Sequence, residues 1–175
     1  MAYVFQLVPR PAPKTNVVTA DTKEHFTENY GAPYAVTMDP FLSPLGVPCQ
    51  EPPWGALASA DLRTGKIVWM HRTGTTRDRM PSFLPIGFKM GMPGFGGPLI
   101  TASGVVFYSG SLDDYIRAYD ETTGRQLWQA RLPAGGQATP MTYRVNGKQF
   151  VVVSAGGHGS AGTPLGDAFV AYALP

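Results

Sequence analysis

A glycine-rich string near the end of the chain, Gly156-Gly-His-Gly159, contains one histidine. Glycine lets a backbone approach a flat ligand closely, and an imidazole can hydrogen-bond an oxygen of that ligand. Gly157 and His158 are therefore candidates for a binding contact. A loop histidine with a structural or solvated role is the plain alternative, and the residues alone leave both interpretations open.

Two adjacent acids, Asp113 and Asp114, follow a turn that starts at Gly110. Paired carboxylates at such a turn can bind a cation or accept a hydrogen bond from a substrate hydroxyl. An ordinary Asp-rich turn also explains them without any ligand.

The tryptophans have two predicted roles. Trp69 and Trp128 could stack on a flat ligand, but each closes the same repeated string. We predict instead that their indoles pack between neighbouring sheets and donate their N–H to a backbone carbonyl. Trp54 lies outside the repeat and is freer to line a site. The methionines of residues 80–92 have no His or Cys nearby and are predicted to pack in a core or loop.

The elements that must position these residues are organised around that repeat. It occurs as Ser59-Ala-Asp-Leu-Arg-Thr-Gly-Lys-Ile-Val-Trp69 and as Ala118-Tyr-Asp-Glu-Thr-Thr-Gly-Arg-Gln-Leu-Trp128. Asp can hydrogen-bond the backbone of its own turn, and Gly allows positive φ, so each string predicts a tight hairpin. Two copies indicate one supersecondary unit used at least twice.

Short β-rich stretches separated by turn residues predict an all-β fold. The expected strands are 3–8, 55–61, 66–73, 99–101, 105–109, 115–119, 125–131, 139–145, 149–155 and 168–174. Strands in groups of four that end in a repeated Trp are typical of propeller blades. A β-sandwich is the alternative, but it does not explain the repeated turn.

The remaining segments are expected to be irregular. Residues 1–54 form a Pro-rich irregular segment apart from the first strand, with a short helical turn considered at 22–28. Residues 55–175 carry the blade strands, interrupted by a long irregular segment at 74–98. Proline cannot donate to a sheet ladder, which is the reason for the first assignment.

Composition excludes several classes of protein. The 175 residues carry a net charge of +2 without a Lys/Arg run, so nucleic-acid binding is not expected. The single cysteine, Cys49, cannot form an internal disulfide and is predicted to be a small buried side chain. No apolar run is long enough to span a bilayer, and the first residues do not form a signal peptide.

Longer strings carry a resemblance to one family. The repeat resembles the tryptophan-docking motif of quinoprotein dehydrogenases, which carry pyrroloquinoline quinone (PQQ) on an eight-bladed β-propeller. The membrane-bound glucose/quinate dehydrogenase branch is similar in further strings, from about Leu7 to the C-terminus. They are Pro40-Phe-Leu-Ser-Pro-Leu-Gly-Val-Pro-Cys49, Gly91-Met-Pro93 with Gly96-Gly-Pro98, Leu132-Pro-Ala-Gly-Gly-Gln-Ala-Thr-Pro-Met-Thr-Tyr143, Ser154-Ala-Gly-Gly-His-Gly159 and Val170-Ala-Tyr-Ala-Leu-Pro175.

The resemblance implies a C-terminal portion, about two to three blades of eight. It implies oxidation of a sugar or polyol hydroxyl, with glucose as the first candidate substrate and quinate as the alternative. The reaction is expected at the periplasmic face of the inner membrane, with electrons passed to ubiquinone. The matching family His lies at the PQQ and substrate site, so His158 and Gly157 become expected cofactor contacts, and Asp113 an expected substrate or cation contact. The resemblance places four parts upstream of this chain: the catalytic base, the Ca²⁺ or Mg²⁺ ligands, the other blades and a membrane anchor. No metal ligand is expected within this chain.

Two other outcomes stay open. A non-catalytic binding or assembly propeller can share the repeat, although Gly-Gly-His-Gly is not expected in one. The chain on its own is also expected to be inactive and to associate, because repeat units need neighbours to bury their apolar sides. It would then be a fragment or a truncated reading frame.

Overall fold

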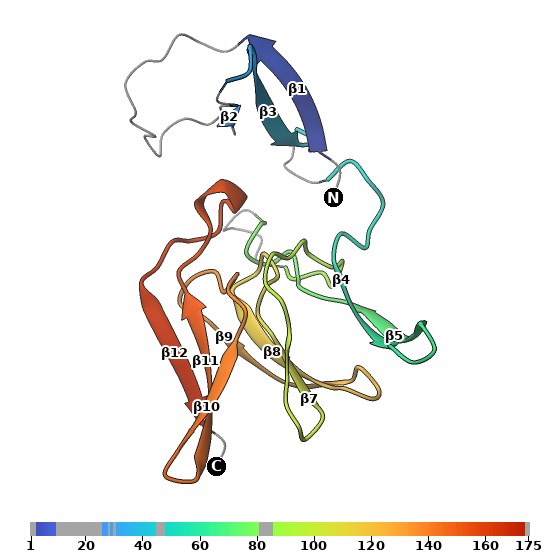
Figure 1. Ribbon diagram of the computed structural model, residues 1–175, viewed down its shortest axis with the longest axis vertical. Helices are drawn as coiled ribbons and strands as arrows, with labels where there is room; N and C mark the ends of the chain where they lie inside the picture. Colours follow the sequence, from blue (N-terminus) through green and yellow to red (C-terminus); the bar gives the residue numbers. More distant parts are fainter. Residues whose placement is uncertain are drawn as a thin grey trace. The chain divides into compact units, whose positions relative to one another are not determined.

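The regular elements of the chain are almost all β-strands (Figure 1). The computed structural model describes residues 3–9, 26–27, 29, 31–44, 48–80 and 86–173. Within these residues the one helical element is a short 3-10 turn, η1 (Gly159–Ala161). None of the described helical structure is long and apolar enough to cross a membrane. The chain divides into two parts, Met1–Glu51 and Pro52–Pro175, and each is described by itself.

The first part contains a small antiparallel sheet. Its strands are β1 (Tyr3–Pro9), β3 (Tyr34–Pro40) and β2 (Phe26–Thr27), in the order β1-β3-β2. Strand β1 was predicted, but the expectation that the rest of residues 1–54 is irregular is wrong for β3. Pro33 precedes the strand and Pro40 is its last residue, so the backbone N–H groups between the two prolines can pair with β1.

Two smaller expectations fall in the same part. The helical turn considered at residues 22–28 is a strand at Phe26–Thr27, and the rest of that span lies outside the described residues. Cys49 is exposed and not buried. It follows Pro48, which forms an isolated bridge with Leu42, and its N–H donates to the Phe41 carbonyl over 3.1 Å. Cys49 therefore belongs to a surface turn.

The second part contains three sheets (Figure 1). A two-stranded sheet joins β4 (Ala56–Asp61) and β5 (Lys66–Arg72). A four-stranded sheet follows in the order β6 (Leu99–Ile100), β7 (Val105–Tyr108), β8 (Tyr115–Asp120) and β9 (Gln126–Arg131). The last sheet joins β10 (Met141–Val145), β11 (Lys148–Ala155) and β12 (Ala168–Ala173). Every strand predicted for residues 55–175 is present within a few residues of its expected ends.

The two central strands of the four-stranded sheet, β7 and β8, are mostly buried. One face packs against the β10–β12 sheet through a cluster of buried side chains: Phe107, Ile116, Ala118, Leu132, Ala134, Val151, Val153 and Ala155. The opposite face presents Val106, Tyr108 and Tyr119, against which Leu57 of β4 packs. Successive residues of β7 thus point to opposite neighbours, as the pleat of a strand requires. Burying a side chain as fully as Ile116 contributes about 1.5–3 kcal/mol.

The repeated strings form matching hairpins, as predicted. The register of β4–β5 shifts between Ser59 and Ala60, and that of β8–β9 shifts between Ala118 and Tyr119, which is the same place in the repeat. Both hairpins therefore contain the same β-bulge, which increases the local twist.

Trp69 joins the two hairpins. Its indole N–H donates to the Glu121 carbonyl, in the β8–β9 turn, over 2.7 Å. Trp128 makes an edge-on contact with Tyr172 of the next sheet, with ring centroids 4.9 Å apart. No acceptor for the Trp128 indole N–H lies among the residues that the structure describes. The prediction of indoles packed between sheets is confirmed, and the backbone acceptor is confirmed for Trp69.

Candidate functional site

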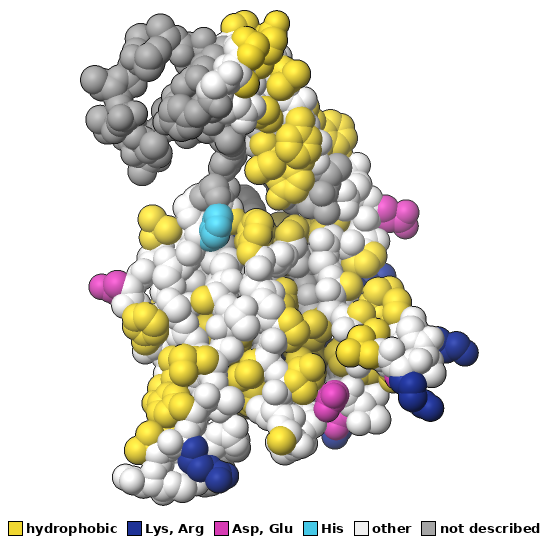
Figure 2. All heavy atoms as spheres, in the orientation of Figure 1, with side chains coloured by type: hydrophobic (Ala, Val, Ile, Leu, Met, Phe, Trp, Pro, Cys, Tyr) yellow, Lys and Arg dark blue, Asp and Glu magenta, His cyan; other side chains and the backbone are white. Residues whose placement is uncertain are grey.

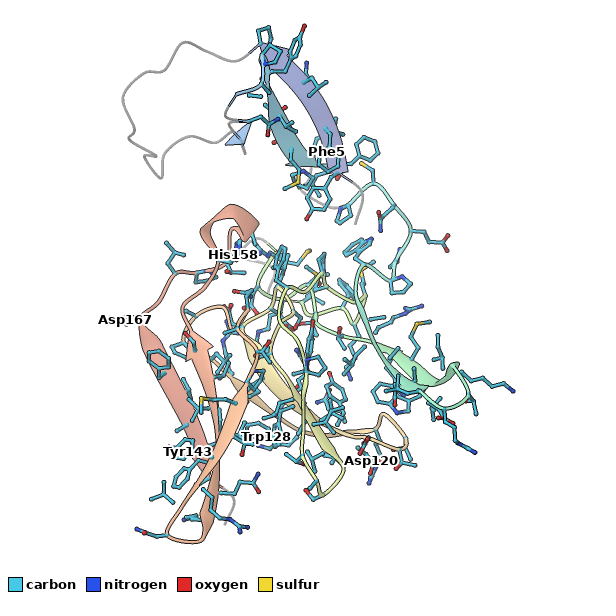
Figure 3. All side chains as sticks on the ribbon, in the orientation of Figure 1. Phe5, Asp120, Trp128, Tyr143, His158 and Asp167 are labelled. Atoms are coloured by element: carbon cyan, nitrogen blue, oxygen red, sulfur yellow. The ribbon has the colours of Figure 1, made fainter. Side chains whose placement is uncertain are left out.

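The candidate residues gather in connections at one end of the strands. Because antiparallel strands alternate in direction, the connections 109–114, 132–140 and 156–167 leave β7, β9 and β11 at the same end. Figure 3 places His158 at this end and Asp120, which begins the β8–β9 turn, at the opposite end. Loops carried by a rigid scaffold are where binding residues concentrate. We call this end the loop face.

The His158 side chain is exposed on the loop face and lies flat against a second ring. The imidazole and the Phe95 ring are nearly parallel, with centroids 5.0 Å apart and planes inclined by 9°. The His158 backbone N–H donates to the Thr163 hydroxyl over 2.7 Å, which fixes the backbone where the ring begins. A flat, partly fixed pair of rings can contact a planar ligand by stacking and by hydrogen bonding.

Gly157 acts through the backbone. Its φ is +72°, which favours glycine, and a Cβ there would lie 2.0 Å from the Pro164 carbonyl oxygen. Its N–H donates to the Gly135 carbonyl over 2.8 Å. The residue therefore lets the loop close on itself directly beside His158. A direct contact of Gly157 with a cofactor stays a prediction.

Asp113 lies beneath the loop face in a network of buried polar side chains and is 0% exposed. Its carboxylate accepts hydrogen bonds from Arg117, from the Ser111 hydroxyl at 2.6 Å and from the Thr75 N–H at 2.8 Å. Burial acts to raise the pKa of Asp113, but the hydrogen bonds and charge of Arg117 outweigh it, so the pKa lies below its ordinary value. Both oxygens are engaged, so the geometry favours a structural role, and a ligand contact stays a prediction.

Asp114 belongs to a second ionic group that the sequence did not reveal. Arg131 pairs with Asp78 at 2.6 Å and approaches Asp114 at 3.7 Å, while the Asp114 N–H donates to Asp78. Burial, followed by the nearby Asp78 charge, raises the pKa of Asp114. One oxygen of Asp114, Oδ1, is buried without a hydrogen-bond partner among the described residues. This group attaches the segment around Asp78 to the start of β8 and the end of β9.

A continuous chain of hydrogen bonds connects the buried network to His158. The Gln137 side chain donates to the Ser111 carbonyl over 3.2 Å, and the Thr163 hydroxyl donates to the Gln137 amide oxygen over 3.0 Å. The same Thr163 hydroxyl accepts from His158. Asp113 and His158, which the sequence suggested separately, are therefore linked through three intermediate residues. Gln137 lies within the string Leu132–Tyr143 but was not singled out as a site residue, and Thr163 belongs to none of the strings quoted above.

Trp54 and two of the methionines of residues 80–92 pack inside the loop face. Trp54 and Met92 are buried against Leu112, and Met90 packs beside them. A Cβ at Gly55 would overlap the Met92 carbonyl, so the two segments approach closely there. The prediction that Met92 packs in a core is confirmed. Trp54 belongs to this packed cluster and is not positioned by the structure to line an open site.

The residues fit a planar anionic quinone in part. The exposed His158–Phe95 ring pair supplies a flat contact, and Arg79 places positive charge in the segment next to the loop face. No group of three His, Cys, Asp or Glu side chains among the described residues could hold a metal ion.

Sheets packed face to face and joined by a docked tryptophan define a segment of a β-propeller. Residues 1–151 match the family described as PQQ: Glucose/ethanol/alcohol dehydrogenase, beta-propeller domain. The chain belongs to this family.

Curated relatives extend the similarity over the whole chain. The quinoprotein glucose dehydrogenase of Escherichia coli (strain K12) is 52% identical over 182 aligned residues, which cover 100% of this chain and 23% of that protein. Quinoprotein glucose dehydrogenase A of Acinetobacter calcoaceticus is 49% identical, covering 100% of this chain and 22% of that protein. The quinate/shikimate dehydrogenase (quinone) of Acinetobacter baylyi is 45% identical over 82% of this chain and 18% of that protein. The chain thus spans about a quarter or less of these relatives.

Proposed function

We propose that the chain forms the C-terminal blades of a membrane-bound, PQQ-dependent dehydrogenase that oxidises a sugar hydroxyl, with glucose as the first candidate. The observation that carries this proposal is the identity of 52% to a quinoprotein glucose dehydrogenase over the whole chain. The quinate/shikimate relative is 45% identical over a smaller share of the chain, which makes quinate the second candidate.

In this proposal the loop face contributes contacts and orientation. PQQ, when bound, would supply the two-electron acceptor for the hydride that leaves the carbon bearing the substrate hydroxyl. His158 hydrogen-bonds an oxygen of the cofactor or substrate, and Phe95 restricts rotation of the imidazole. The catalytic base, the Ca²⁺ or Mg²⁺ ligands, the remaining blades and a membrane anchor come from other parts of the protein. We further propose ubiquinone as the electron acceptor and the periplasmic face of the inner membrane as the location.

A pair of chimeras tests the substrate class. In one, this chain replaces the matched segment of the E. coli quinoprotein glucose dehydrogenase; in the other, it replaces the matched segment of the quinate/shikimate dehydrogenase. We expect PQQ-dependent oxidation of glucose by the first host and loss of quinate oxidation in the second. Activity restored in the quinate host alone would replace glucose by quinate. Inactivity of both hosts, with each chimera folded in membranes, would overturn the proposal.

The role of His158 is tested in the glucose chimera. We expect His158→Ala to raise the PQQ concentration for half-maximal activity, or the KM for glucose, by about tenfold, since one hydrogen bond to a bound ligand is lost. Ubiquinone is tested in the same membranes by following its reduction with glucose as the only donor.

A further inference from the structure

Arg79 reaches from the irregular segment after β5 to the loop that carries His158. Its Nη1 donates to the Gly162 carbonyl over 2.8 Å, and its Nη2 donates to the Ala161 carbonyl over 2.5 Å. These partners lie more than 80 residues further along the chain. The guanidinium therefore joins two segments of the loop face that no strand connects.

The two carbonyls belong to the end of η1, where a helix leaves its last acceptors without internal partners. A planar guanidinium with a fixed fork of donors suits two adjacent carbonyls better than a single ammonium does. Gly162, which ends η1 with φ +64°, leaves room for this contact, because a Cβ there would lie 3.3 Å from Nη1. Arg79 thus satisfies the end of η1 and holds it in one place.

His158 lies at the other end of the same short turn. Its carbonyl accepts the Ala161 N–H over 3.0 Å, and its own N–H donates to Thr163. Ala161 therefore contacts both Arg79 and His158, one through its carbonyl and the other through its N–H. A displacement of η1 at the Arg79 end moves the backbone from which the imidazole projects.

Arg79 is itself well anchored. Its backbone N–H donates to the Thr76 carbonyl over 2.9 Å, and the Thr76 hydroxyl accepts the Phe88 N–H over 3.1 Å. Burial lowers the pKa of Arg79, and the charges of Asp114 and Asp78 oppose that effect. The guanidinium is thus fixed by its two hydrogen bonds at the end of η1, with the charges of Asp114 and Asp78 favouring its ionised form.

We propose that Arg79 is a positioning residue that fixes η1 and, through it, presents His158 to the ligand of the loop face. This inference rests on the proposed contact between His158 and PQQ or substrate. Arg79 does not touch the reacting atoms. It determines where the backbone of His158 is held.

The experiment compares Arg79→Ala, Arg79→Lys and Arg77→Ala in the glucose chimera. Arg77 is the matched control, since it is exposed and donates only to the Tyr115 hydroxyl, at 3.2 Å, among the contacts described for its side chain. We expect Arg79→Ala to raise the PQQ concentration for half-maximal activity about tenfold while kcat changes by less than about threefold, as expected for a lost binding contribution. Arg79→Lys should recover part of the effect, and Arg77→Ala should match the parent.

A second readout does not depend on activity. Hydrogen exchange of the cofactor-free chimera should become faster for backbone amides 157–163 in Arg79→Ala, while amides of β11 keep the parent rate. Unchanged exchange at 157–163, or faster exchange with an unchanged PQQ requirement, would overturn the inference and leave the proposed function in place. A parent chimera without PQQ-dependent glucose oxidation would overturn glucose as the proposed substrate, and with it the role of Arg79 in glucose oxidation.

Discussion

The turns of the two repeated hairpins, β4–β5 and β8–β9, have nearly the same backbone but different surroundings. We call them the docking turns. In the β4–β5 turn, Gly65 has φ +68°, and no described atom lies within 4 Å of the place where a Cβ would be. In the β8–β9 turn, Gly124 has φ +70°, and a Cβ there would lie 2.4 Å from His71 and 2.6 Å from Trp69. The second turn is covered by side chains of the neighbouring sheet, and the first is not covered by any described residue.

The comparison separates two reasons for a glycine at one motif position. The first is conformational, because the turn needs positive φ in both copies. The second is the close approach of a neighbouring tryptophan, which the structure shows only at Gly124. Figure 2 shows many exposed apolar side chains and few charged ones on the visible face. Sheet surfaces of this kind are suited to cover by further blades.

Substitution of the two glycines tests the comparison most strongly. We expect Gly124→Ala to lower the free energy of unfolding of the chain by about 2–5 kcal/mol, combining about 1–2 for the left-handed backbone and about 1–3 for overlap with Trp69 and His71. Gly65→Ala should cost only about 1–2 kcal/mol. Urea unfolding measures both. Equal costs in the isolated chain would show that cover at Gly124 contributes nothing.

The same pair of variants in the glucose chimera sharpens the result. If a preceding blade covers the Gly65 turn there, the two costs should become similar. A gap as large as in the isolated chain would contradict the placement of this segment beside another blade.

The docked indole gives the next largest effect. Trp69→Phe removes the donor to the Glu121 carbonyl and should cost about 1–2 kcal/mol, because a packed acceptor loses its partner. Trp128→Phe, the matched substitution in the other hairpin, should cost less, since Trp128 is 37% exposed and has no described acceptor. Thermal unfolding of both variants, followed by circular dichroism, compares them. A larger loss for Trp128 would reverse this ranking of the hairpins.

His71 adds a smaller contribution to the covered turn. Its ring stacks on Trp69 with centroids 5.4 Å apart, and its Nε2 lies 3.3 Å from the Thr123 carbonyl. We expect His71→Ala to cost about 0.5–1.5 kcal/mol, the range for one ring pair. Met70→Ala, at an exposed position of the same strand, is the control and should be close to neutral. The prediction fails if the two variants unfold at the same urea concentration.

The acids that begin the turns predict the smallest difference, seen in the pH dependence of stability. Hydrogen bonds from the Thr123 hydroxyl and N–H lower the pKa of Asp120, and the Arg63 N–H lowers that of Asp61. Each lowered pKa gives stability that is present above the ordinary value of 3.8 and is lost as pH falls through the lower folded value.

Acid unfolding should therefore become less steep below about pH 4 in Asp120→Asn and Asp61→Asn. We expect the larger change in Asp120→Asn, because its carboxylate accepts three described hydrogen bonds at Thr122 and Thr123, against one at Arg63 for Asp61. Urea midpoints measured between pH 2 and pH 6, about the range of carboxylate titration, give this slope. Parallel pH profiles for both variants and the parent chain would contradict it.

The strands of the second part could be predicted because their signals are local. An Asp, a Gly and a Trp at fixed spacing define each docking hairpin, and Asn146-Gly147 forms the β10–β11 turn. Strand β3 was missed for two reasons. Its partner β1 lies about 30 residues earlier, and the prolines around residues 34–39 led us to expect irregular structure there. Pairing between distant segments is a property of the folded chain and leaves no periodic trace.

The loop face was predictable only in part for the same reason. The string around His158 identified the exposed histidine, but nothing local indicated that the Thr75 N–H donates to Asp113 or that Phe95 stacks on the imidazole. Arg79 lies in a segment without periodicity, and its carbonyl partners are ordinary backbone groups. Contacts of this kind depend on which loops meet at one end of the sheets, and the sequence does not encode that meeting in any single motif.

The β-bulge shared by the two hairpins has a consequence for the history of the fold. Since the extra residue falls at the same motif position in both copies, the strings Ser59–Trp69 and Ala118–Trp128 have equal length and keep the same alternation of inward and outward side chains. Such a unit can be duplicated along the chain, and the side chains of the flanking strands stay on the same faces of their sheets. The shared bulge therefore allows the hairpin to repeat from one sheet to the next while each sheet keeps its own register.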